Sequence, residues 1–260
     1  MTGVFWGLLL SSLALSVFTL GVWGRHIGES AARYRVSWQP DGRAFSIWWL
    51  LYTTTLAAAI VGLALRAAVD QDALLLWSAT WVLTAVWVVL FDNQRQLVLA
   101  ALVLLGAFGA SLVALFLQQA WPSQTGEQIL LFAPLSLLSG WLLVASSVGL
   151  GTALTCDPPS FGEIKAQNEV SLRVYEDAQR DALFARRKEA TTTQNVMVVV
   201  LALVGACLTL FLPDPLFVWP IVWAVLLQRG FPRSGWMWIA LAILVAGCAV
   251  SVVRVFVWQF

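Results

Sequence analysis

The sequence predicts an all-α integral membrane protein, and three observations lead to this prediction. The chain has 260 residues, of which 60% are hydrophobic and only 11% are charged, whereas a soluble domain is about one quarter charged. Apolar runs of about 20 residues, the length that an α-helix needs to cross a bilayer, recur along the whole chain. Because backbone groups find no water inside a bilayer, such runs are expected to be helical.

Eight apolar segments can be delimited. They cover about residues 3–23, 44–66, 73–91, 96–117, 128–154, 195–212, 216–228 and 235–257. The first segment lacks a basic n-region and a good cleavage site, so we expect an uncleaved span rather than a signal peptide. The seventh is short and contains Pro220, so a tilted, half-inserted or kinked segment remains an alternative to a full crossing.

The basic residues are distributed unevenly between the two sides that eight crossings would define. All 15 Lys and Arg residues except Arg66 and Arg254 fall in the odd-numbered connections, which would share one face. The positive-inside rule then places these connections on the cytoplasmic-equivalent side and both termini on the opposite side. If the seventh segment does not cross, this asymmetry weakens but survives. The sequence does not indicate which membrane holds the protein.

One long hydrophilic insertion, residues 156–194, separates the fifth segment from the sixth. Pro158 and Pro159 end the fifth segment, and Glu169 stands four residues before Arg173, in the order that stabilises a helix. We expect a linker helix outside the membrane, either solvated or serving as a docking surface for a partner. The predicted organisation is a five-helix core over 1–155, the insertion over 156–194 and further transmembrane helices over 195–260.

The predicted spans are nearly bare of the ionisable groups that catalysis or ion transport inside a membrane requires. The chain has no HExxH sequence, paired carboxylates, glycine-rich phosphate loop or Ser/His/Asp set. Its three cysteines fit no metal spacing, and the single histidine, His26, excludes a bis-histidine haem site within one chain. We therefore expect no enzymatic activity, no metal site and no covalently bound cofactor. The net charge of +1 also gives no sign of a nucleic-acid partner.

The predicted spans contain few ionisable residues but many tryptophans, of which the whole chain has 15. An interfacial aromatic belt accounts for those near segment ends, but it accounts less well for Trp81, Trp87 and Trp141 inside the segments. Aromatic walls between helices suit a flat apolar ligand such as a tetrapyrrole or a sterol. They equally suit tight packing against pigments, lipids or another subunit.

Several short motifs occur in the order found in a known family. They are Ile27-Gly28-Glu29-Ser30, Pro40, Ala44-Phe45-Ser46-Ile47-Trp48 with Tyr52, Trp87 with Phe91, Arg95-Gln96, Pro134 with Trp141 and Ala145, and Trp223-Ala224. In these residues the chain resembles the tryptophan-rich sensory protein or translocator protein (peripheral benzodiazepine receptor) family, and most of all its extended members with extra C-terminal helices. The resemblance covers residues 1–155 well and 195–257 loosely.

This resemblance implies a five-helix bundle with an aromatic-lined pocket, capped by the loop between the first two spans, that binds porphyrins or sterol-like molecules. The implied lining residues are Trp38, Trp48, Tyr52, Trp87, Trp141 and Ala145. Three polar anchors usual in the family are replaced. Thr84 and Gly149 stand where the family has asparagines, and residues 97–102 lack its acidic residue.

Two functions follow as expectations. The first is non-covalent binding of a hydrophobic ligand, a porphyrin or other tetrapyrrole, a sterol-like molecule or a lipid, within the bundle. The alternative is a non-catalytic accessory or structural subunit of a larger respiratory or photosynthetic membrane complex, joined through residues 156–194. Membrane lipids are expected partners in either case.

Small-residue pairs at Ala58/Gly62 and Gly106/Ala110 suit packing within the bundle or between two copies in a homodimer.

Overall fold

The computed structural model contains helices and no strands in the part of the chain that it describes. The described residues are 2–23, 27, 31, 36, 38–67, 69–92, 96–119, 126–155, 187–211, 215–228 and 235–258. The helices are α1 (Thr2–Trp23), the 3-10 helix η1 (Gly42–Ser46), α3 (Ile47–Leu65), α4 (Gln71–Asp92), α5 (Leu97–Gln119), α6 (Gly126–Thr155), α9 (Arg187–Phe211), the 3-10 helix η2 (Pro215–Val218), α10 (Trp219–Leu226) and α11 (Gly235–Trp258). The predicted all-α fold is confirmed.

Five of the described helices are long and apolar enough to cross a membrane: α1, η1 with α3, α4, α5 and α6. Large apolar side chains such as Trp49 and Val98 point outward from them and stay exposed. Such side chains are stable against lipid, which is as apolar as they are. The protein is therefore a multi-pass membrane protein, as the sequence predicted.

The five long helices form a closed ring, in which α1 contacts α4, α4 contacts α5, α5 contacts α6, α6 contacts α3 and α3 returns to α1. Close approach of α1 to α3 depends on Gly62, because a methyl group there would overlap the ring of Trp6. The short connection from α3 to α4 is held at both ends. Arg66 caps α3 in the left-handed conformation, and the Asp70 carboxylate accepts a hydrogen bond from the Ala73 N–H in the first turn of α4 (2.8 Å).

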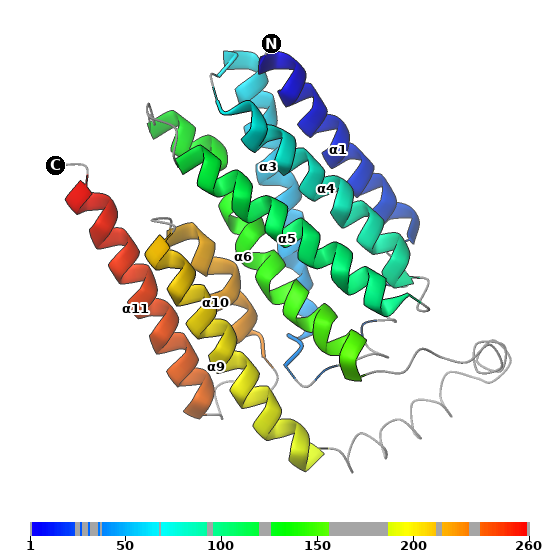
Figure 1. Ribbon diagram of the computed structural model, residues 1–260, viewed down its shortest axis with the longest axis vertical. Helices are drawn as coiled ribbons and strands as arrows, with labels where there is room; N and C mark the ends of the chain where they lie inside the picture. The colour runs from blue at the N-terminus through cyan, green and yellow to red at the C-terminus, as the bar shows by residue number, and fades with distance from the viewer. Residues whose placement is uncertain are drawn as a thin grey trace, which may run out of the picture.

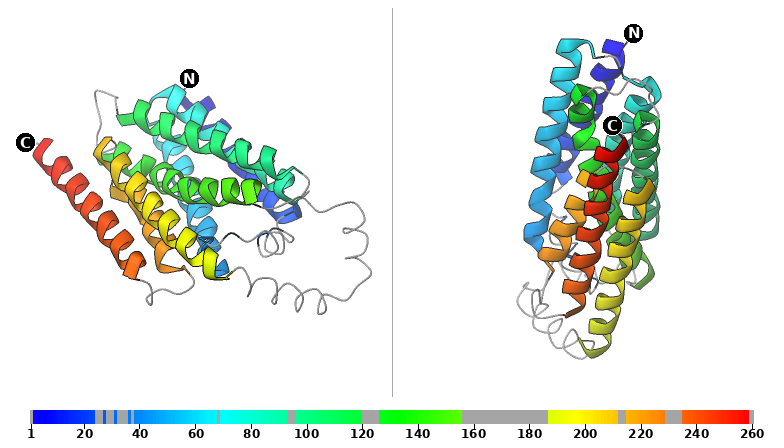
Figure 2. Two further views of the ribbon diagram at one scale, coloured as in Figure 1. Left: turned by 60° about the horizontal axis from the view of Figure 1, so that its bottom comes forward. Right: turned by 90° about the vertical axis from the view of Figure 1, so that its left-hand side faces the viewer.

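Helices α9 to α11, with η2, form a C-terminal unit (residues 187–258) that packs against α6 (Figure 2). Their apolar stretches, residues 196–208, 216–226 and 238–250, are shorter than those of the five long helices. Helix α9 begins at Arg187, so the last residues of the predicted insertion belong to it. The rest of that insertion, 156–186, lies outside the described residues.

The seventh predicted segment is a short helix rather than a full-length span. Helix α10 has eight residues, which at about 1.5 Å each cover far less than a hydrocarbon core of about 30 Å. Pro220 lies in the first turn, where its missing N–H breaks no hydrogen bond. With η2 directly before it, the helical stretch runs from Pro215 to Leu226, so the predicted short apolar segment is confirmed as a helix.

Candidate ligand-binding cavity

Trp48 of α3 lies at the centre of an aromatic cluster inside the ring of helices. It stacks on Tyr52 one turn later, with ring centroids 5.9 Å apart, and on Trp87 of α4 at 6.3 Å. Its edge meets Trp141 of α6 at 6.3 Å and 89°. The spacing of four residues between Trp48 and Tyr52 places both rings on one face of α3, which is why they point into the bundle together.

The cluster extends outward from these rings in three directions. Tyr52 packs on Trp81 (5.1 Å), Trp87 stacks on Phe91 (5.6 Å), and Phe45 meets Trp141 edge to face (5.9 Å). Aromatic pairs at these distances stabilise a bundle by about 0.5–1.5 kcal/mol each beyond the area that they bury. Contacts between aromatic side chains therefore join the three helices α3, α4 and α6 inside the bundle.

A cavity of about 40 Å³ lies beside this cluster. That space holds at most a few water molecules, whereas drug-sized ligands occupy about 300–1,000 Å³. Its walls are mostly apolar, and they are formed by Ile27, Ala31, Gln39, Pro40, Phe45, Trp48, Trp87, Phe91, Leu104, Trp141, Val144, Ala145, Val148, Gly149 and Thr152. A flat ligand therefore needs the aromatic rings or the covering segment to move.

Helix α6 supplies the largest share of the wall. Its lining residues are Trp141, Val144, Ala145, Val148, Gly149 and Thr152. They follow one another at alternating steps of three and one residues, so they form one continuous helix face. Only Trp141 and Ala145 of this set were predicted, although the same periodicity, counted onward from them, would have found the rest.

The end of the cavity is covered by the segment between α1 and α3, here called the cap segment (residues 38–46). Gln39, Pro40 and Phe45 of this segment line the cavity. The Gln39 side chain donates to the carbonyl oxygen of Ala31 (3.1 Å). The ring of Trp38 rests on Gly151 of α6, where a methyl group would overlap it. The described residues of this loop therefore form part of the cavity wall.

The structure brings four of the six predicted lining residues to the cavity: Trp48, Trp87, Trp141 and Ala145. The other two lie nearby but outside the lining. Tyr52 lies behind Trp48, with its hydroxyl 3.3 Å from the Ser16 hydroxyl, and Trp38 packs on Gly151. Pro40, Phe45 and Phe91 belong to the motifs that carry the family resemblance, and Gly149 is one of the departures from the family, but the prediction assigned none of them to the lining.

Polar groups at the cavity are few. The Trp141 indole is 1% exposed, and its Nε1–H has no hydrogen-bond partner among the described residues. Thr84 donates to the Thr80 carbonyl within its own helix (2.8 Å) and does not line the cavity. Gly149 lines the cavity but offers no side chain. Neither replaced asparagine position thus offers a polar side chain to the cavity, and the Trp141 Nε1–H is a buried donor on a lining residue with no partner among the described residues.

A comparison with known families matches residues 4–160 to the TSPO-like protein family. No similar protein of curated function and no similar solved structure is found. The matched region contains the five-helix ring and every residue of the cavity wall, and it ends shortly after α6. The chain therefore belongs to the TSPO-like protein family.

Proposed function

We propose that this protein binds a flat hydrophobic molecule, a tetrapyrrole or a sterol-like compound, in the cavity between α3, α4 and α6. The observation that carries the proposal is that the faces and edges of Trp48, Trp87 and Trp141 bound one apolar cavity inside the family's five-helix ring. Small-molecule sites are usually lined by hydrophobic and aromatic side chains with a few polar groups among them.

Binding of such a ligand requires the cluster to open, because the free volume is only about 40 Å³. A planar ligand inserted beside Trp48 would replace ring–ring contacts by ring–ligand contacts of the same kind. The aromatic contact energy is then exchanged rather than lost. The Trp141 Nε1–H would donate to a carboxylate, carbonyl or hydroxyl oxygen of the ligand and so fix its orientation.

The test is a titration of the purified protein with protoporphyrin IX, followed by quenching of tryptophan fluorescence. Trp48→Ala removes the central ring, whereas Trp49→Ala removes a neighbouring ring that is 70% exposed on the outside of the same helix. We expect the dissociation constant to rise about tenfold or more for Trp48→Ala, as when a buried aromatic anchor is lost, and to change little for Trp49→Ala. Equal effects of the two substitutions would place the ligand elsewhere.

We also infer that the basic connections lie on the cytoplasmic-equivalent side and that both termini lie on the opposite side. The charge asymmetry supports this inference. So does the arrangement of the helices, because α1 begins and α11 ends at the same end of the molecule (Figure 1).

The second candidate function, a structural subunit of a larger membrane complex, is favoured by one observation. The aromatic side chains fill most of the space that they enclose, as core residues do, and leave about 40 Å³ free. In that case the cluster would stabilise the bundle and hold no ligand. Particle size and bound pigment after mild extraction separate the two functions.

A further inference from the structure

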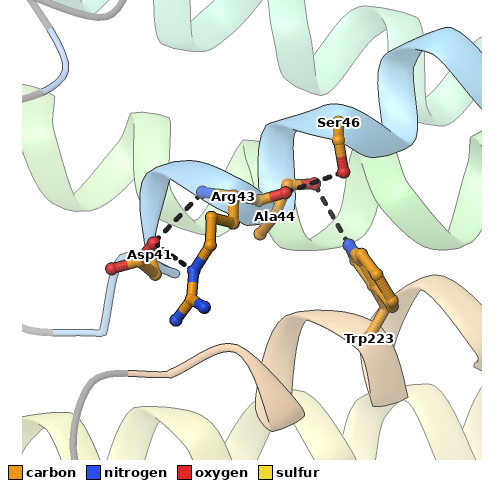
Figure 3. Close-up of polar contacts among 5 residues, drawn as sticks. All are labelled: Asp41, Arg43, Ala44, Ser46 and Trp223. Atoms are coloured by element: carbon orange, nitrogen blue, oxygen red, sulfur yellow. Dashed lines mark hydrogen bonds and ion pairs between the residues drawn. The ribbon is translucent and has the colours of Figure 1, made fainter.

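The C-terminal end of α10 meets the cap segment through three hydrogen bonds. The Trp223 Nε1–H donates to the Ala44 carbonyl oxygen (3.2 Å), as Figure 3 shows. The Asp41 N–H donates to the Leu227 carbonyl oxygen (2.8 Å). The Gln228 side-chain amide donates to the Trp38 carbonyl oxygen (2.6 Å). These hydrogen bonds join residues that lie far apart in the sequence, and 179 positions separate the two residues of the first bond.

In each of the three bonds the acceptor is a backbone carbonyl oxygen. The last carbonyls of a helix have no partner within it, and Leu227, which follows α10, offers such a carbonyl to the Asp41 N–H. Trp38 and Ala44 take part through their backbone carbonyls, so these contacts depend on the path of the cap segment rather than on its side chains. Within the cap segment, the Asp41 carboxylate accepts two hydrogen bonds from Arg43, one from the Arg43 backbone N–H and one from the Arg43 Nε–H (Figure 3).

The segment that α10 holds is the one that covers the cavity. Gln39, Pro40 and Phe45 line the cavity, and each is the immediate neighbour in the chain of a bonded residue, which is Trp38, Asp41 or Ala44 respectively. An outward movement of this segment opens the cavity wall. The same movement must also break the three bonds to the end of α10.

The C-terminal unit is itself fixed to α6, the helix that forms the opposite wall. A methyl group at Gly140 would overlap the backbone carbonyl oxygen of Phe217 in η2, so these two backbones are in direct contact. Gly140 directly precedes Trp141 of the cavity wall. Helix α6 thus lines the cavity with one face and contacts the C-terminal unit with another. Helix α10 of that unit in turn contacts the cap segment.

We propose that Trp223 and Gln228 are positioning residues for the ligand site, which hold the cap segment closed and so control entry to the cavity. This proposal rests on the proposed ligand-binding function. It assigns a role to residues 215–228, which lie outside the family match at 4–160. The ligand class is unchanged; the C-terminal unit governs how fast such a ligand enters and leaves.

The test uses the full-length protein in detergent, with Ala145→Cys as a reporter inside the cavity and the native cysteines Cys156, Cys207 and Cys248 replaced by alanine. Trp223→Phe removes the indole donor and keeps an aromatic ring, and Gln228→Met removes the amide donor at similar length. Trp219→Phe is the matched control, because Trp219 lies on the same short helix and is 59% exposed. The readouts are the rate of reaction of the reporter with a small maleimide and, without the reporter, the rates of protoporphyrin IX association and dissociation.

We expect each substitution to raise the maleimide rate about three- to tenfold, because one hydrogen bond shifts an opening equilibrium by about that factor. The rates of porphyrin association and dissociation should rise together with the maleimide rate, while Trp219→Phe matches the wild type.

Unchanged rates in both variants, in a protein that does take up porphyrin, would overturn the proposal and leave the binding function intact. Faster maleimide reaction without any porphyrin uptake would uphold the control by α10 and contradict the proposed ligand. If one variant loses the wild-type unfolding midpoint, the other carries the test.

Discussion

At the scale of single residues, Trp48 is the side chain on which Tyr52, Trp87 and Trp141 converge. The run from Phe45 through Trp48 to Tyr52 placed the rings on one helix, and the structure shows Trp48 at the centre of the cluster. The edge-to-face contact of Phe45 with Trp141 was not predictable, because it depends on how α6 is rotated beside α3. The apolar wall residues Val144 and Val148 carry no chemical signature that separates them from lipid-facing valines.

A residue-scale prediction concerns the contact of Gly62 with Trp6. Trp6 is fully buried, and its ring occupies the space that a side chain at position 62 would need. We expect Gly62→Ala to destabilise the protein by about 1–3 kcal/mol, the usual effect of overpacking a core. Gly7→Ala, on the facing helix with open space around it, should leave stability unchanged or raise it slightly through helix propensity.

Thermal unfolding in one detergent, followed by circular dichroism, measures both variants. An equal midpoint for Gly62→Ala and Gly7→Ala would show that α1 and α3 are not in close contact at this point.

At the scale of elements, the predicted ranges of the first five segments agree closely with the helices, since length and hydropathy determine a membrane span. The segment 73–91 corresponds to Gln71–Asp92, and 128–154 to Gly126–Thr155. Agreement is weaker after residue 155. The start of α9 at Arg187 was missed because its first residues are polar, and the eight-residue α10 was visible only as a short segment containing Pro220.

An element-scale prediction concerns the direction of the C-terminal unit. Helix α10 is too short to cross alone, yet α11 ends at the same end of the molecule as the start of α1. We therefore expect an epitope tag at either terminus to show the same protease protection in sealed vesicles, and a tag placed after Arg180 to show the opposite protection. A C-terminal tag that is cleaved together with the tag after Arg180 would contradict this topology.

At the scale of the whole molecule, the fold class followed from the sequence but the arrangement of the helices did not. Helices such as α3 and α4 are apolar on all sides, so no polar stripe indicates which face points inward. Of the small residues singled out in the sequence, Gly62 marked an inward-facing side of its helix. The structure uses Gly62, Gly140 and Gly151 for close approaches of a ring or a backbone. The contacts between α10 and the cap segment join distant parts of the chain, and all three acceptors are backbone carbonyl oxygens, which leave no trace in a single sequence.

The measurement that tests the central claim most directly is mild detergent extraction from the native membrane, followed by sizing and an absorbance spectrum of the same peak. Binding of a tetrapyrrole predicts a small particle that carries a Soret-like band, or that takes up added protoporphyrin IX with quenching of tryptophan fluorescence. A large particle with many other polypeptides and no porphyrin uptake would contradict the claim. It would show that the cluster around Trp48 packs the bundle of a structural subunit.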